Sequence, residues 1–161
     1  MAALYTRHEV RNLASKNRQP ELHSHHEELV RGLYDQMKSV FESSEQPMYL
    51  YLDDTHKTCN KKLASLLGYK GPDEWTSVEE FSDMVEDESM KSLTTAYQDA
   101  MTRMVGSTIN VTWRKKSGGK VDSSVILVPV AYNGHLFALH FIPRKLSWNS
   151  LRSPTFPTPS S

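Results

Sequence analysis

The sequence predicts an α+β domain with five β-strands, several short helices and two long amphipathic helices. Three observations predict it. Apolar residues recur at spacings of three and four within 25–43 and 87–105, as expected for helices with one apolar face. Two short strand-like segments lie between these helices, within 47–59. Three longer strand-like segments follow the second helix, and the last two flank Asn133-Gly134, the strongest two-residue hairpin signal in the chain.

Length and composition limit the possible classes of protein. The chain has 161 residues, 38% of them hydrophobic, and 19 basic against 19 acidic side chains. That is enough for one domain, and the balanced charge argues against a dedicated nucleic-acid binder. Cys59 is the only cysteine, which excludes an internal disulfide and suits a reducing cytoplasm. The longest apolar run, 125–132, is too short to span a bilayer. We therefore expect a cytoplasmic protein that binds neither nucleic acid nor membrane.

The chain begins with a segment, 1–22, that we expect to be partly helical or disordered. A cap or dimerisation helix is predicted over 23–45, with Ser24 as N-cap and Glu27 at the capping-box position. Its apolar stripe contains Leu29, Leu33, Met37, Val40 and Phe41. The stripe can pack against the core of this chain, or it can form a dimer; the two are compatible.

The middle of the chain alternates short strands and helices. We expect strands over 47–53 and 57–59, followed by a helix over 61–67 that Asn60 caps and Gly68 ends. One or two helical turns are expected around Trp75. The second long helix, 87–105, has Gly106 as its stop and presents one apolar face: Leu93, Ala96, Tyr97, Ala100, Met101 and Met104.

The remainder reads as a β-meander with strands over 108–115, 120–132 and 135–142, then a disordered Pro/Ser/Thr tail over 144–161. A type I′ turn at Asn133-Gly134 fixes the hairpin register. It pairs Tyr132 with His135, Val130 with Phe137, Val128 with Leu139 and Ile126 with Phe141. A turn at 117–119 that pairs Lys115 with Lys120 places Pro129 opposite Gly106, where the neighbouring strand has not begun.

Both faces of this hairpin are mostly apolar, so both must be covered. The later helices cover one face. The helix that carries the Leu29–Phe41 stripe is the natural cover for the other face, and a second chain is an alternative. The pattern does not say which face is which.

The element order and several local motifs resemble a PAS domain. The motifs are Tyr49–Asp54, NKKLASLLGY at 60–69, the Gly71–Trp75 turn, WRKKSGG at 113–119 and the final hairpin. The resemblance implies a PAS domain over 47–143. Its fold would be a five-stranded antiparallel sheet with short helices and one long helix on one face, and the N-terminal amphipathic helix covering the other.

PAS domains are sensor and interaction modules, and some bind a ligand between the long helix and the sheet. The resemblance therefore implies a stand-alone sensory or signalling module, without an output domain in the chain, that acts by small-ligand binding, by dimerisation, or by both. We expect a homodimer and a signalling partner protein. The alternative is a ligand-free interaction module. Candidates to line a ligand pocket are Tyr97, Met101, Met104, Trp113, Phe137, Leu139 and Phe141.

The nature of any cofactor stays open. A LOV-type flavin site needs a reactive cysteine, which the matching stretch 77–86 lacks, and Cys59 lies elsewhere. Haem sensing in this family often uses a histidine on the long helix, and 87–105 contains none. We therefore expect neither. On the last strand, His140 is a better candidate to face a cavity than His135.

Metal sites and catalytic sites have no clear motif in this sequence. His23, His25 and His26 adjoin Glu27 and Glu28, but their spacing matches no recognised zinc pattern. A solvated helix start is the preferred interpretation and adventitious metal binding the alternative, so no metal site is expected. The sequence contains no G-x-S-x-G, phosphate-loop or H-E-x-x-H motif. We expect no catalytic residues, and a small α+β enzyme is the least supported function.

Overall fold

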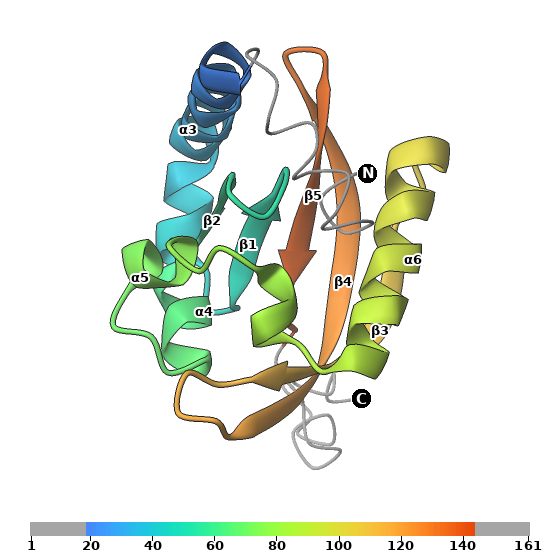
Figure 1. Cartoon of the computed structure of the whole chain (residues 1–161). Helices are drawn as coiled ribbons and strands as arrows, with labels where there is room; N and C mark the ends of the chain where they lie inside the picture. The colour runs from blue at the N-terminus through green and yellow to red at the C-terminus, as the bar shows by residue number, and fades with distance from the viewer. Residues whose placement is uncertain (1–18, 144–161) are drawn as a thin grey trace, which may run out of the picture.

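The computed structural model describes residues 19–143. The tail predicted over 144–161 and most of the segment predicted over 1–22 lie outside the described residues. The elements, in chain order, are α3 (Gln19–Ser43), β1 (Met48–Tyr51), β2 (Lys57–Cys59), α4 (Lys61–Leu66), α5 (Pro72–Thr76), the 3-10 helix η1 (Phe81–Met84), α6 (Asp87–Arg103), β3 (Ser107–Arg114), β4 (Lys120–Tyr132) and β5 (His135–Phe141) (Figure 1).

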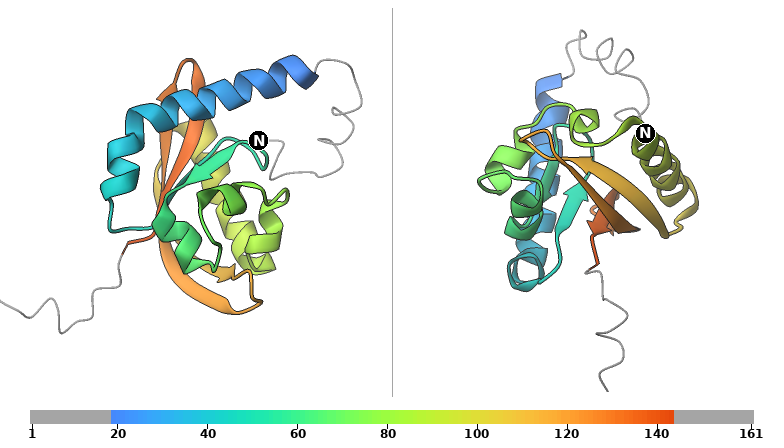
Figure 2. Two further views of the ribbon diagram at one scale, coloured as in Figure 1. Left: turned by 90° about the vertical axis from the view of Figure 1, so that its left-hand side faces the viewer. Right: turned by 90° about the horizontal axis from the view of Figure 1, so that it is seen from below.

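The five strands form one antiparallel sheet in the order β2-β1-β5-β4-β3. Helices α4, α5 and α6 with η1 lie on one face of it, and α3 crosses the other face (Figure 2). We call these the inner face and the outer face. The predicted architecture, with the N-terminal amphipathic helix covering the second face, is confirmed.

The β4–β5 hairpin has the predicted register. Tyr132 pairs with His135, and the ladder continues to Ile126 opposite Phe141. Asn133 and Gly134 have φ angles of 46° and 76°. Two consecutive positive φ angles are what a type I′ turn requires, and Asn-Gly adopts them at low cost.

The β3–β4 register differs from the prediction by one residue. Arg114, and not Lys115, pairs with Lys120. The connecting loop is longer than expected, because the Lys115 amide instead donates to the Gly119 carbonyl at 2.7 Å. Pro129 still lies beyond β3, which begins at Ser107 opposite Leu127. Its missing N–H therefore costs no bond to that strand.

Two helix ends also differ from the prediction. Helix α3 begins at Gln19, so Ser24 lies inside it and is not its N-cap. Pro20 falls in the first turn, where the missing N–H is not needed. Helix α6 ends at Arg103, because Met104 adopts the left-handed conformation with a φ of 55° and donates its amide to Ala100. The predicted stop, Gly106, lies beyond that point.

Asn60 caps α4 as predicted and also joins three segments. Its side-chain oxygen accepts from the amides of Leu63 at 3.0 Å and Met48 at 3.1 Å. Its amide nitrogen donates to the Gln46 carbonyl at 2.8 Å. One buried side chain thus fixes the start of α4 against the segment that enters β1.

The sheet separates two apolar clusters. The inner cluster contains large aromatic side chains from both the sheet and the short helices, among them Tyr49, Trp75, Phe81 and Trp113. The outer cluster lies between α3 and the sheet: Leu29, Val30, Leu33, Phe41, Met48, Leu50, Phe137 and Leu139. Neither of the long helices, nor any other helix between residues 19 and 143, has the length and hydropathy to cross a membrane.

Candidate functional site

The inner face holds a very small cavity. Its lining residues come from β1, η1, α6 and β5: Tyr51, Phe81, Leu93, Tyr97 and His140. Its volume is about 10 Å³, which is space for about one water molecule. Three of the five lining side chains are phenyl or phenol rings, from Tyr51, Phe81 and Tyr97.

Four of the seven predicted pocket residues lie on the inner side or near it. Tyr97 lines the cavity and donates its hydroxyl to the Leu52 carbonyl at 3.3 Å. Trp113 is buried in the inner cluster and donates its indole N–H to Ser123. Met101 packs at the edge of this cluster, whereas Met104, which follows α6, is 56% exposed.

The other three predicted pocket residues lie on the opposite face. Phe137, Leu139 and Phe141 alternate along β5 with residues that point inward, and they pack in or against the outer cluster under α3. The seven residues therefore do not line one pocket, because the sheet separates these three from Tyr97.

Some polar atoms in the inner cluster have no partner. The Tyr49 hydroxyl, the Trp75 indole nitrogen and Nδ1 of His140 are buried without a hydrogen bond to any described residue. Burial lowers the pKa of His140 to about 3, so its imidazole is neutral. Unpaired buried polar groups are costly. They are the feature of the inner face that most resembles a place for a small polar molecule.

The predicted dimer stripe is divided between core and surface. Leu29, Leu33 and Phe41 are buried against the outer face of the sheet. Met37 is half-buried beside them. Val40 is 50% exposed. The stripe therefore packs mainly on its own sheet, and Val40 is left at the surface.

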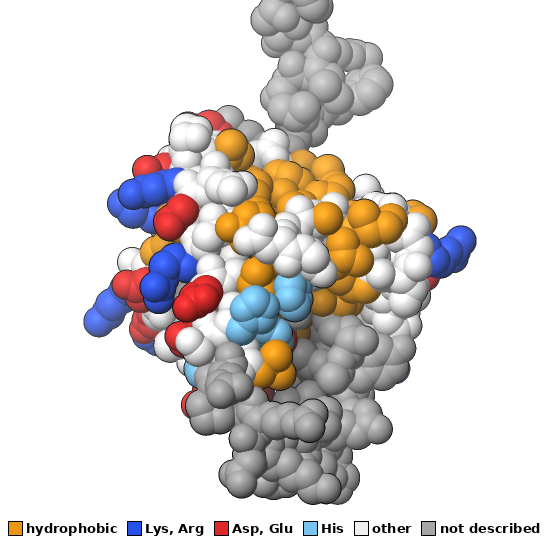
Figure 3. All heavy atoms as spheres, turned by 90° about the horizontal axis from the view of Figure 1, so that it is seen from above, with side chains coloured by type: hydrophobic (Ala, Val, Ile, Leu, Met, Phe, Trp, Pro, Cys, Tyr) orange, Lys and Arg blue, Asp and Glu red, His pale blue; other side chains and the backbone are white. Residues whose placement is uncertain are grey.

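The outer face also leaves apolar side chains partly uncovered on the strands. They belong to β4 and β5 and are half-buried: Ile126, Val128, Val130, Tyr132 and Phe141. Figure 3 shows hydrophobic side chains gathered at the end of the molecule where α3 and the β4–β5 hairpin meet. We call Val40 and these five residues the outer apolar strip.

A buried lysine lies at the edge of the inner cluster. Lys57 on β2 is 2% exposed, and its Nζ donates to the carbonyls of Thr76 at 3.2 Å and Val78 at 2.6 Å. The same Nζ lies 5.5 Å from the centre of the Trp75 ring. Burial lowers the pKa of Lys57 to about 8, although the nearby carboxylates of Asp54 and Asp53 oppose the shift. These contacts fix α5 and the segment after it to β2, which is a structural role.

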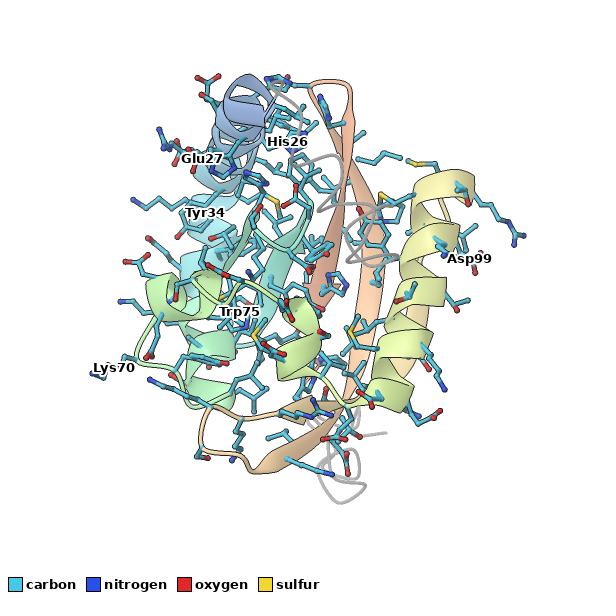
Figure 4. All side chains as sticks on the ribbon, viewed as in Figure 1. His26, Glu27, Tyr34, Lys70, Trp75 and Asp99 are labelled. Atoms are coloured by element: carbon cyan, nitrogen blue, oxygen red, sulfur yellow. The ribbon has the colours of Figure 1, made fainter. Side chains whose placement is uncertain are left out.

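A cluster of five imidazoles and one carboxylate lies where the first turns of α3 meet the sheet, and we call it the histidine cluster. Three members come from α3, two from the β1–β2 turn and one from the start of β5: His23, His25, His26, Asp53, His56 and His135. Figure 3 shows the imidazoles together on the surface, and Figure 4 shows His26 on the side of α3 toward the sheet.

Asp53 is the centre of this cluster. Its carboxylate oxygens lie 2.6 and 2.8 Å from Nδ1 of His56, and one of them lies 3.2 Å from Nδ1 of His26. Nε2 of His56 lies 2.6 Å from Nδ1 of His23. Close by, the Nε2 atoms of His25 and His135 are 3.3 Å apart.

The environment sets the charge of two members of the cluster. Burial raises the pKa of Asp53, but hydrogen bonding and the charge of His56 outweigh it, so the pKa lies below its ordinary value. Burial also lowers the pKa of His26, and this outweighs the opposing effect of Asp53. Asp53 is therefore ionised at neutral pH, and the neutral form of His26 is favoured.

Sequence reasoning identified the three α3 histidines but not the rest of this cluster. Asp53 lies at the end of the strand expected over 47–53, His56 lies between the two expected strands, and the sequence marks His135 only as a weaker cavity candidate than His140. The antiparallel pairing of β1 with β5 brings His135 to the end of the sheet where the β1–β2 turn lies. The hairpin register gives no sign of that pairing. The other predicted position, His140, does line the cavity.

Cys59, the only cysteine, is buried on β2. Burial raises the pKa of its thiol to about 12, the opposite of what a reactive cysteine needs. Cys59 therefore has a packing role in this fold.

Comparison with solved structures identifies the fold as that of a PAS domain. A PAS domain from a two-component sensor histidine kinase has 11% identity and a TM-score of 0.55, over 70% of this chain and 96% of that one. The PAS domain of an HTR-like protein from Haloarcula marismortui has 13% identity and a TM-score of 0.54, over 73% and 96%. The Rhodobacter sphaeroides LOV protein has 15% identity and a TM-score of 0.53, over 74% and 71%.

No family model matches the sequence, and no curated protein is similar to it. At these identities the similarity establishes the fold, and the predicted PAS resemblance is confirmed at that level.

Proposed function

We propose that this chain is a PAS signalling module that acts by self-association through α3 and the outer face of the sheet. One observation carries the proposal: Val40 is 50% exposed on a helix that buries Leu29, Leu33 and Phe41, and the rest of the outer apolar strip is only half-buried. The small inner cavity supports the same choice, since a space for about one water molecule leaves little room for a signalling ligand.

A second copy of the chain is the occupant that fits this surface. A twofold axis through the outer face would bring the same apolar strip on each copy together, as in an isologous interface. The exposed side chains of α3 carry both signs of charge, including Arg31, Asp35, Lys38 and Glu42. Glu27 and Glu28 are exposed as well, so the described part of α3 carries four exposed acidic and two exposed basic side chains. The pairing of two such helices therefore has to bring opposite charges together to avoid like-charge repulsion.

Sedimentation of the full chain over a range of concentrations tests the proposal. We expect a dimer for the wild type and a monomer for Val40→Asp, because a carboxylate would have to be buried in the interface. Ser39→Asp is the matched control, since Ser39 is the exposed neighbour on the same helix. A wild type that stays monomeric, or a Val40→Asp protein that stays dimeric, would contradict self-association through this face.

The second candidate function is ligand sensing in the inner cluster. The unpaired buried atoms of Tyr49, Trp75 and His140 favour it, because a small polar ligand would supply their missing hydrogen bonds. Native mass spectrometry and an absorption spectrum of protein purified without added ligand separate the two functions. A stoichiometric bound molecule would support ligand sensing, and a dimer without one would support self-association alone.

A further inference from the structure

We infer that His26, Asp53 and His56 form a binding site for a divalent transition-metal ion such as Zn²⁺. One ligand atom from each residue lies within 4.8 Å of the other two. In a tetrahedral zinc centre with zinc–nitrogen bonds of about 2.0–2.1 Å, neighbouring ligand atoms are about 3.3 Å apart. Small rotations of the side chains therefore suffice to close the site. The inference does not depend on the proposed self-association.

The donor set selects the class of metal. Two imidazole nitrogens and one carboxylate oxygen suit zinc and the neighbouring transition metals, whereas Ca²⁺ and Mg²⁺ prefer sites made of oxygen atoms. Cys59, the only cysteine, is buried on β2 and is not one of the three clustered residues, so the site has no thiolate ligand. Three protein ligands leave a fourth coordination position.

The neighbouring histidine His23 is placed to orient His56 within this site. Its Nδ1 lies 2.6 Å from Nε2 of His56, on the side of that ring opposite Asp53. His56 thus contacts a carboxylate at one nitrogen and an imidazole at the other. This is the arrangement by which a neighbouring group orients a metal-binding histidine.

Part of the site is rigid before any metal binds. Oδ1 of Asp53 accepts from the amides of Thr55 at 3.0 Å and His56 at 2.8 Å, which fixes the carboxylate within the β1–β2 turn. His56 is 7% exposed. His26 lies on α3, whereas Asp53 and His56 both lie in the β1–β2 turn. A bound ion would therefore attach the first turns of α3 to the sheet.

Calorimetric titration of the metal-free full chain with Zn²⁺ tests the inference. We expect one zinc ion per chain, and a loss of affinity of at least about tenfold in His26→Gln and in Asp53→Asn. His25→Gln is the matched control, because His25 belongs to the histidine cluster but not to the three proposed ligands. Equal affinity in the wild type and His26→Gln, or an equal loss in His25→Gln, would overturn the assignment of the ligands.

A second measurement guards against variants that unfold. His26 is half-buried and its replacement leaves both apolar clusters intact, so the melting temperature of metal-free His26→Gln should be close to that of the wild type. Zn²⁺ should raise the melting temperature of the wild type but not that of the variant, since only a bound ion stabilises the folded state. A zinc effect of the same size in both proteins would show that the ion binds elsewhere.

Discussion

The imidazole of His140 stacks on the phenol ring of Tyr49, with ring centres 4.0 Å apart and planes 11° apart. Both rings are buried between the sheet and the short helices, and the nearest free space is the cavity that His140 lines. A neutral imidazole is accommodated there, whereas a protonated one would be a buried charge without an opposite charge beside it among the described residues.

The burial of His140 predicts a loss of stability in acid. The pKa of His140 falls from 6.5 to about 3 on folding. Between these values the unfolded chain binds a proton that the folded chain does not, so the free energy of unfolding falls as the pH falls from 6.5 toward 3. The contribution is on the order of a few kcal/mol. His140→Phe, measured by urea unfolding at several pH values, should lose less stability in acid than the wild type does.

The exposed histidine variant His25→Gln is the control for that experiment, and its acid profile should parallel the wild type. Carboxylates with lowered pKa values, such as Asp53, also destabilise the fold as they are protonated. The acid loss in unfolding free energy must therefore be compared between the wild type and His140→Phe, and the difference between the two losses reports on His140. Identical profiles would show that His140 does not cause the acid sensitivity.

Leu33→Ala should destabilise the protein much more than Val40→Ala. Both residues belong to one apolar stripe of α3. Leu33 faces the sheet and is 4% exposed, whereas Val40 is 50% exposed. A buried leucine truncated to alanine costs about 2–5 kcal/mol, whereas a surface change costs about 0.5 kcal/mol or less. Urea unfolding measures the stability of both variants. A low protein concentration is used so that self-association does not contribute to the measured free energy. Similar costs would mean that α3 does not pack on the sheet as described.

Asn60→Ala should cost about 2 kcal/mol or more. It removes an N-cap, leaves the buried amide of Met48 without its partner, and removes one of the two hydrogen bonds to the Gln46 carbonyl. Asn110→Ala is the matched control, because Asn110 is exposed on β3 and accepts only a 3.3 Å hydrogen bond from Ser124. Thermal unfolding of the two variants should separate them clearly, and an Asn60→Ala protein as stable as the Asn110→Ala protein would contradict the role given to this cap.

Cys59 should not react with a thiol reagent while the protein is folded. The thiol is buried and its pKa is raised to about 12, so almost no thiolate is present at neutral pH. A chromogenic disulfide reagent should detect one thiol per chain in denaturant and almost none in buffer. Rapid labelling in buffer would show that β2 opens far more readily than its packing implies.

The local parts of the fold were predictable because the residues that determine them are close in sequence. Asn133 and Gly134 determine their own turn and, through it, every pair of the β4–β5 ladder. Asn60 determines the start of α4 in the same way. The β3–β4 register was wrong by one residue because Gly118 and Gly119 permit more than one loop length, and the pattern does not choose between them.

The sites were harder to predict, because they depend on which face of the sheet each helix covers. The alternation along β5 showed that Phe137, Leu139 and Phe141 share a face, but nothing local showed that this face packs on α3. The histidine cluster combines residues from α3, the β1–β2 turn and β5. No spacing rule in one segment detects such a cluster, since the folded sheet brings the segments together.

The main-chain amide of Ile142, just after β5, donates to the carbonyl of Pro47, just before β1, at 2.9 Å. Beside it, Met48 pairs with Phe141 at the end of the β1–β5 ladder. A tensile force applied through residues 47 and 143 would therefore meet these bonds one after another from the end of the ladder, as in unzipping, and not all together, as in shear. A PAS core loaded in this way yields at low force, and it yields first where the helix that covers it joins the sheet.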